Sequence, residues 1–265
     1  KIVDVFSIRG RPIFVKGSVN FNRNLSMGTL LSENGEKTDV TLDAKGISAT
    51  GYNIGMMFKP TKQITLGLDY RSEIIMEARG GSAEFADVPD FAKPTFTNTT
   101  FDADLPLPAE ITAGISYQVT EKWLFAFDYN HTKWGVYKSL DVDFANSVPT
   151  SVNPRNYKDA SSYRLGAQYK ASEKFTLRAG WYFDESPVQD GYFAPETPRN
   201  DSNGYTGGLT YQVNSKLGVD LSFLYLHFDE IDNSYNYFQE AGTLVPFSGT
   251  YKSTVFAPGI GITYG

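Results

Sequence analysis

The chain has 265 residues, no cysteine and a net charge of -6. The lack of cysteine excludes disulfides and thiolate metal sites, the acidic balance argues against general nucleic-acid binding, and no apolar run is long enough for a membrane-spanning helix. Aromatic residues reach 15% and there are 24 glycines, a composition typical of an all-β chain.

Ten segments alternate apolar residues with polar or small ones, as β-strands with one covered face do. In chain order they span residues 1–8, 50–59, 62–70, 109–118, 122–129, 162–170, 174–183, 204–212, 216–225 and 257–265. Four short polar turns, KPTK, VTEK, ASEK and VNSK, join neighbouring segments. The sequence therefore predicts ten strands that pair as antiparallel neighbours.

Long polar segments separate the strands at their other ends. They are Leu25–Glu36, Gly80–Thr100, Asn146–Lys158, Pro187–Asn203 and Asp229–Ser248. Short turns at one end of a sheet and long loops at the other are typical of outer-membrane barrels.

The two faces of the predicted strands differ in charge. One face carries no charged residue, and Leu66, Phe125, Leu177 and Leu221 are representative of it. If bilayer hydrocarbon contacts this face, only a closed barrel satisfies every backbone hydrogen bond. We therefore predict a transmembrane antiparallel up-and-down β-barrel with a charged lumen. The alternative, a soluble β-sandwich, would bury those four side chains in a dry interior.

Aromatic residues on the uncharged face fall at two heights along the strands. The row near the turns contains Phe58, Tyr117, Tyr169, Tyr211 and Tyr264, and the second row contains Tyr70, Tyr129, Trp181 and Phe223. The rows are separated by roughly 20–25 Å at the usual strand rise and tilt. This spacing matches the two interfacial aromatic girdles of a membrane barrel.

Several segments resemble a known family when they are taken in order. GLDYRSEI, PLPAEITAGISYQVTEKWLFAFDYNHTKW, SSYRLGAQYK, FTLRAGWYFDESPV and GLTYQVNSKLGVDLSFLYLH resemble the outer-membrane long-chain fatty acid transporter family, FadL/TodX type. The resemblance implies a fourteen-stranded barrel with an N-terminal hatch and a sideways exit for hydrophobic substrates. Because ten strands are recognisable, we expect residues 1–265 to be a single barrel domain that is the C-terminal part of such a protein, without the hatch and the first four strands.

The expected function is passive transport of hydrophobic compounds such as long-chain fatty acids across the outer membrane of a Gram-negative bacterium. The alternative is a structural or interaction subunit of an outer-membrane secretion or assembly complex. We expect hydrophobic small molecules, outer-membrane lipids and lipopolysaccharide as partners, possible protein partners in a membrane complex, and no nucleic acid. No catalytic residue, metal or cofactor is expected.

Charged residues on the lumenal face are the candidate ligand contacts. Arg71, Arg164 and Arg178 are the best candidates for an acidic head group, because a guanidinium binds a carboxylate in a bidentate manner. Glu73 and Asp184 complete the candidate set. The competing interpretation, a lumenal salt-bridge network that holds the wall in shape, is favoured for any single residue.

Three further features leave alternatives open. His131 with Asp128, or His227 with Asp229, would suit a rim enzyme, but no nucleophile accompanies them and an interface histidine is favoured. Aromatic residues of the long segments form either a substrate groove or packing among loops; they are Phe91, Phe96, Phe101, Trp134, Tyr137, Tyr192, Phe193, Tyr235, Tyr237 and Phe238. Pro12 and Pro258 fall within strands, where proline is tolerated at bulges or edges. A bulge would suit a lateral opening in the wall, and a local kink without function is favoured.

Overall fold

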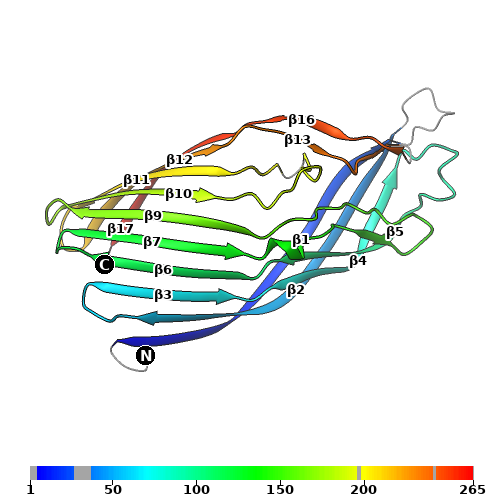
Figure 1. Cartoon of the computed structure of the whole chain (residues 1–265). Helices are drawn as coiled ribbons and strands as arrows, with labels where there is room; N and C mark the ends of the chain where they lie inside the picture. Colours follow the sequence, from blue (N-terminus) through cyan, green and yellow to red (C-terminus); the bar gives the residue numbers. More distant parts are fainter. Residues whose placement is uncertain (1–4, 27–36, 196–197, 241–242, 265) are drawn as a thin grey trace.

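The structure is a computed structural model that describes residues 5–26, 37–195, 198–240 and 243–264 (Figure 1). Ten strands form one continuous antiparallel ladder, as predicted. They are β1 (Phe6–Ser26), β2 (Lys37–Phe58), β3 (Ile64–Arg71), β6 (Glu110–Gln118), β7 (Trp123–Thr132), β9 (Ala160–Lys170), β10 (Phe175–Asp184), β11 (Ser202–Gln212), β12 (Leu217–Phe228) and β17 (Thr254–Tyr264). The ladder runs from β1 to β17, and no backbone pairing between described residues joins these two strands. Within the same residues, no helix has the length and hydropathy needed to cross a bilayer.

The four predicted turns share one hydrogen-bonding pattern. A side-chain oxygen in each turn accepts hydrogen bonds from backbone N–H groups two and three residues later. The acceptors are Thr61, Thr120, Ser172 and Asn214. Such side chains imitate a backbone turn and hold it tight, which explains why the strands are joined so closely at this end.

The opposite end contains more structure than the sequence predicted. The segments there include β4 (Ile74–Ala86), β5 (Thr99–Leu107), η1 (Trp134–Val136), β8 (Val142–Phe144), β13 (Ile231–Tyr235), β14 (Gln239–Glu240), β15 (Thr243–Leu244) and β16 (Phe247–Tyr251). The expectation that Gly80–Thr100 and Asp229–Ser248 are loops throughout is therefore wrong, because strands occupy parts of both. Most of Leu25–Glu36 lies outside the described residues.

A hydrophobic core sits at this loop end. Val40 and Leu42 of β2 pack with Phe85 of β4 and Phe101 of β5, and all four are buried. Alternation on β2 produces this core, because every second residue from Thr38 to Ala44 is buried. Phe101 and Phe193 are almost fully buried, which favours packing among loops over an open aromatic groove.

The uncharged face of the ladder is its exposed outer face. Leu66, Phe125, Leu177 and Leu221 are 38%, 45%, 46% and 49% exposed. A sandwich core would bury these side chains, so the soluble alternative is excluded. The inner face, by contrast, holds Asp128 and Arg178 beside backbone glycines.

The two aromatic rows are present on the outer face. Near the turns, the rings of Trp123 and Tyr169 lie 4.5 Å apart between centroids. Toward the loops, the rings of Tyr129 and Tyr163 lie 5.4 Å apart. Tyr163 and Tyr169 are six residues apart on β9, which corresponds to about 20 Å along the strand.

Both strand prolines lie in the outermost strands of the ladder. Pro12 of β1 pairs with Tyr52, and Pro258 of β17 pairs with Phe223. Both prolines are therefore edge-strand prolines. The bulge interpretation does not apply to Pro12, because the register shift between β1 and β2 falls at Gly17 and Val19.

Candidate functional site

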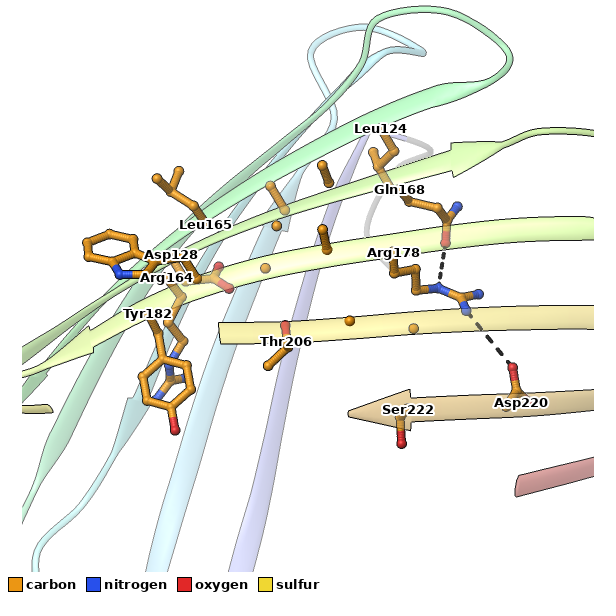
Figure 2. Close-up of a pocket in the computed structure, with 18 of the residues that line it drawn as sticks. Leu124, Asp128, Arg164, Leu165, Gln168, Arg178, Tyr182, Thr206, Asp220 and Ser222 are labelled. Carbon is orange, nitrogen blue, oxygen red and sulfur yellow. Dashed lines mark hydrogen bonds and ion pairs between the residues drawn. The ribbon is translucent and has the colours of Figure 1, made fainter. Parts of the chain in front are cut away.

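A hollow of about 530 Å³ lies on the inner face of strands β7 and β9 to β12 (Figure 2). Glycines create it, because Gly166 of β9 pairs with Gly180 of β10, and Gly180 in turn pairs with Thr206 of β11. Positions without a side chain leave the wall one backbone thick. Charged and polar side chains then define the two ends of the hollow.

Arg178 closes the end of the hollow nearer the turns. Its Nε donates to Gln168 Oε1 at 2.9 Å, its Nη1 donates to Thr210 Oγ1 at 2.6 Å, and Nη1 lies 3.9 Å from Asp220 Oδ1. Figure 2 shows this guanidinium stretched between β9 and β12. Because the Arg178 guanidinium already contacts protein acceptors, it fits the interpretation of a polar network that holds the wall in shape.

Arg164 lies at the opposite end of the hollow. Its neighbours across the sheet are Asp128 on β7 and Tyr182 on β10, and Figure 2 shows the three side chains together. The Arg164 side chain is exposed. Within the described parts of the chain, it makes no ion pair or hydrogen bond. An exposed guanidinium without a protein partner is available to an anionic ligand.

Tyr182 lies flat against the wall beside Arg164. A Cβ atom added to Gly204 would stand only 2.1 Å from the Tyr182 ring. The ring therefore occupies the space that any side chain at position 204 would need. Glycine at this position lets the aromatic ring lie along the sheet and keeps the hollow open.

An apolar stripe continues from Tyr182 across the inner face. Leu226 pairs with Gly204, and Leu224 and Phe228 occupy the neighbouring inward positions of β12. These three residues were not among the site residues predicted from the sequence. The sequence contains a pattern that could have identified them. In LSFLYLHF, apolar residues occupy both the outward and the inward positions, whereas the inward positions of the other strands are mostly polar or small.

The other three candidate residues lie outside this hollow. Arg71 Nη2 lies 3.3 Å from Glu110 Oε2, and Asp184 accepts a hydrogen bond from Ser162 and pairs with Arg199. Both are engaged in wall contacts. The five residues predicted from sequence therefore do not form one site.

Glu73 does not face the lumen as expected. Strand alternation shifts at Ser72, whose side chain turns toward Gly51, as does that of Ile74. Glu73 lies between Ser72 and Ile74 and is exposed, whereas both neighbours are buried. The Ser72 hydroxyl accepts a hydrogen bond from the Tyr52 N–H at 3.0 Å, which fixes this irregularity.

Neither histidine joins the aspartate proposed for it from sequence. Asp128 lines the inner hollow, whereas His131 Nε2 lies on the outer side, 3.7 Å from Asp159 Oδ2. His227 pairs with Asn203 and Thr254 in the ladder. Across the described ranges, no group of three or more His, Cys, Asp or Glu side chains is placed to hold a metal ion.

Comparison with known proteins gives consistent relatives. The chain is 27% identical over 201 residues to outer membrane protein P1 of Haemophilus influenzae, covering 74% of this chain and 43% of that protein. It is 25% identical over 186 residues to a long-chain fatty acid transport protein of Salmonella typhi, covering 67% and 42%. The chain thus spans less than half the length of these relatives.

Solved structures show the same fold. A Pseudomonas aeruginosa FadL homologue superimposes with a TM-score of 0.86 at 20% identity, over 100% of this chain and 65% of that one. The Pseudomonas putida toluene transporter TodX gives 0.64 at 17% identity, over 100% and 66%.

The family model described as "Outer membrane protein transport protein (OMPP1/FadL/TodX)" matches residues 1–265. Together with the ladder, its exposed apolar face and its two aromatic rows, this match places the chain in the outer membrane of Gram-negative bacteria. The chain therefore belongs to the OMPP1/FadL/TodX family of outer membrane transport proteins.

Proposed function

We propose that this chain forms the wall of a passive transporter for hydrophobic molecules that carry an acidic head group, such as long-chain fatty acids. The observation that carries the proposal is Arg164, an exposed arginine of the inner face with no protein partner in the described residues. It stands at one end of an apolar stripe. A cation beside apolar surface suits an amphipathic anion.

The geometry suits a long acyl chain. Arg164, Tyr182, Gly204 and Leu226 lie opposite one another on four successive strands. Three strand spacings correspond to roughly 14 Å. A carboxylate on Arg164 can therefore extend its chain over the Tyr182 ring, across Gly204 and onto Leu226.

The free guanidinium also favours acids over neutral hydrocarbons. A carboxylate can accept two parallel hydrogen bonds from arginine. A neutral hydrocarbon over Arg164 would remove water from the charge and return no hydrogen bond. Of the relatives, one is named for long-chain fatty acids and another for toluene, and the inner wall described here supports the first class.

Transport along this wall needs diffusion and weak contacts, with no catalysis or energy source. The names of the relatives support transport over the alternative of a structural subunit in a secretion or assembly complex.

The test uses the full-length protein that contains this chain, reconstituted in lipid vesicles. Binding and uptake of a fluorescent long-chain fatty acid are measured for the natural protein and for Arg164→Gln. A hydrogen bond to a charged group contributes about 1.5–3 kcal/mol, so binding should weaken by about ten- to a hundredfold.

The matched control is Arg79→Gln, which removes an arginine that pairs with Asp104 on β5, outside the hollow. It should leave binding unchanged. Equal affinities for Arg164→Gln and the natural protein, or equal affinity for the acid and its methyl ester, would contradict the proposal.

A further inference from the structure

A group of polar side chains lies on the outer face at the loop end of β7 and β9, away from the hollow. His131 Nδ1 is 3.2 Å from Ser161 Oγ, and His131 Nε2 is 3.7 Å from Asp159 Oδ2. A serine, an imidazole and a carboxylate in this order are the arrangement by which proteins activate a hydroxyl nucleophile. The sequence alone indicates no nucleophile for His131, because Ser161 is thirty positions away and only strand pairing brings it close.

The carboxylate of this group is held in place. Asp159 Oδ1 accepts a hydrogen bond from the Gly135 N–H at 2.8 Å. A Cβ atom at Gly135 would stand 2.9 Å from the same oxygen, so glycine permits the close approach. In the His131 tautomer that carries its proton on Nε2, that proton faces the Asp159 carboxylate and Nδ1 can accept the Ser161 proton.

A hydrogen-bond donor for a developing oxyanion is also present. The Tyr129 hydroxyl lies 3.1 Å from Ser161 Oγ, and tyrosine can supply this function in acyl transfer. The side chains of His131 and Asp159 are 32% and 46% exposed, so water can reach them. Ser161 itself is 9% exposed, and an acyl carbonyl would take the place beside Oγ that the Tyr129 hydroxyl now fills.

The height of this group on the barrel indicates its substrate. Tyr129 pairs with Tyr163 in the aromatic row toward the loops, and His131 pairs with Ser161 two residues nearer the loops on both strands. Two residues correspond to about 7 Å. Aromatic rows mark the lipid head-group level of a membrane. Ser161 therefore stands at the head-group level of outer-leaflet lipids, whose acyl esters lie at the inner edge of that layer.

We propose that Ser161, His131 and Asp159 form a hydrolytic site for acyl esters of lipids at the outer surface of the barrel. Ser161 Oγ attacks the ester carbonyl carbon while its proton passes to His131 Nδ1, and Tyr129 donates a hydrogen bond to the oxyanion. The ester C–O bond breaks, the leaving alcohol takes the proton from His131, and the acyl group remains on Ser161. Water then gives a proton to His131 and attacks the acyl carbonyl; release of the fatty acid returns the proton to Ser161.

This activity goes beyond the proposed transport and fails separately from it, because it involves no residue of the inner hollow. The two are chemically linked, since the hydrolytic product is a long-chain carboxylate. That is the class of molecule for which the Arg164 end of the hollow is suited.

The test treats the full-length protein, in vesicles of phosphatidylethanolamine and phosphatidylglycerol, with a lipophilic fluorophosphonate. Peptide mass spectrometry should find the adduct on Ser161. A general base contributes about 10²–10⁴-fold, so His131→Gln should slow labelling at least a hundredfold. Release of a fluorescent fatty acid from labelled phospholipid should fall in parallel.

Ser116→Ala is the matched control, because Ser116 faces inward from β6 opposite Ala126. It should label and hydrolyse as the natural protein does. Heat-dependent electrophoretic mobility confirms that each variant is folded. Folded natural protein without an adduct on Ser161, or Ser161→Ala with undiminished lipid hydrolysis, would overturn the proposal and leave the group as a set of structural polar contacts.

Discussion

Gly204 offers a direct test of how the inner hollow is kept open. In the Gly204→Ala variant, the new Cβ would stand 2.1, 2.2 and 2.7 Å from three carbons of the Tyr182 ring. Contacts this short cannot persist, so the ring must leave the wall and swing toward the lumen beside Arg164. Overpacking of this kind costs about 1–3 kcal/mol. We expect lower stability together with weaker fatty acid binding, because the displaced ring obstructs the path from Arg164 to Leu226.

Gly207→Ala is the matched substitution on the same strand, since no atom lies within 4 Å of a Cβ at Gly207. Urea unfolding in vesicles and fluorescent fatty acid binding are measured for both variants. Adding Tyr182→Ala to Gly204→Ala should restore most of the lost stability, and the coupling in this double-mutant cycle isolates the ring contact. Equal unfolding free energies and equal fatty acid affinities for Gly204→Ala and Gly207→Ala would refute this explanation.

Two further predictions concern the outer face and the loops. Leu68→Arg on the outer face should cost about 2–4 kcal/mol in vesicles, whereas Thr65→Arg on the inner face of the same strand should cost far less; similar unfolding free energies would contradict the assignment of faces. In the loops, the hydrogen bond to Tyr192 raises the pKa of Tyr237 above its usual 10.0. A raised folded-state pKa means that the stabilising contribution is present below pH 10 and is lost as the pH rises through the folded value. Absorbance at alkaline pH should therefore include a late tyrosine step from Tyr237, and Tyr192→Phe should move that step to lower pH.

Strand parity was predictable because lipid permits few exceptions. A charge on the outer face is costly in hydrocarbon, so β9 to β12 keep Leu165, Leu177 and Leu221 on one side without interruption. The turns were equally readable, since Thr, Ser and Asn at a fixed place in each provide the oxygen that closes it. Local chemistry alone decides both features.

The roles of individual arginines were not predictable, because register decides them. Arg164 and Arg178 share the inner face, yet Arg178 lies opposite Gln168 and within reach of Asp220, whereas Arg164 lies opposite Tyr182. The predicted lumenal orientation of Glu73 was wrong for a related reason. The alternation shifts where the Ser72 side chain replaces a backbone acceptor for Tyr52, and nothing in the local sequence marks that exchange.

The four turns held by side-chain hydrogen bonds have a consequence for how the protein assembles. Register errors in a hairpin move every side chain to the wrong face, and in a barrel wall that would expose charges to hydrocarbon. Because Thr61, Thr120, Ser172 and Asn214 fix each turn through neighbours only two and three residues away, each strand pair can choose its alignment before any distant contact exists. We expect hairpins that are aligned in this way to enter the wall in the correct register, with their charged residues toward the lumen.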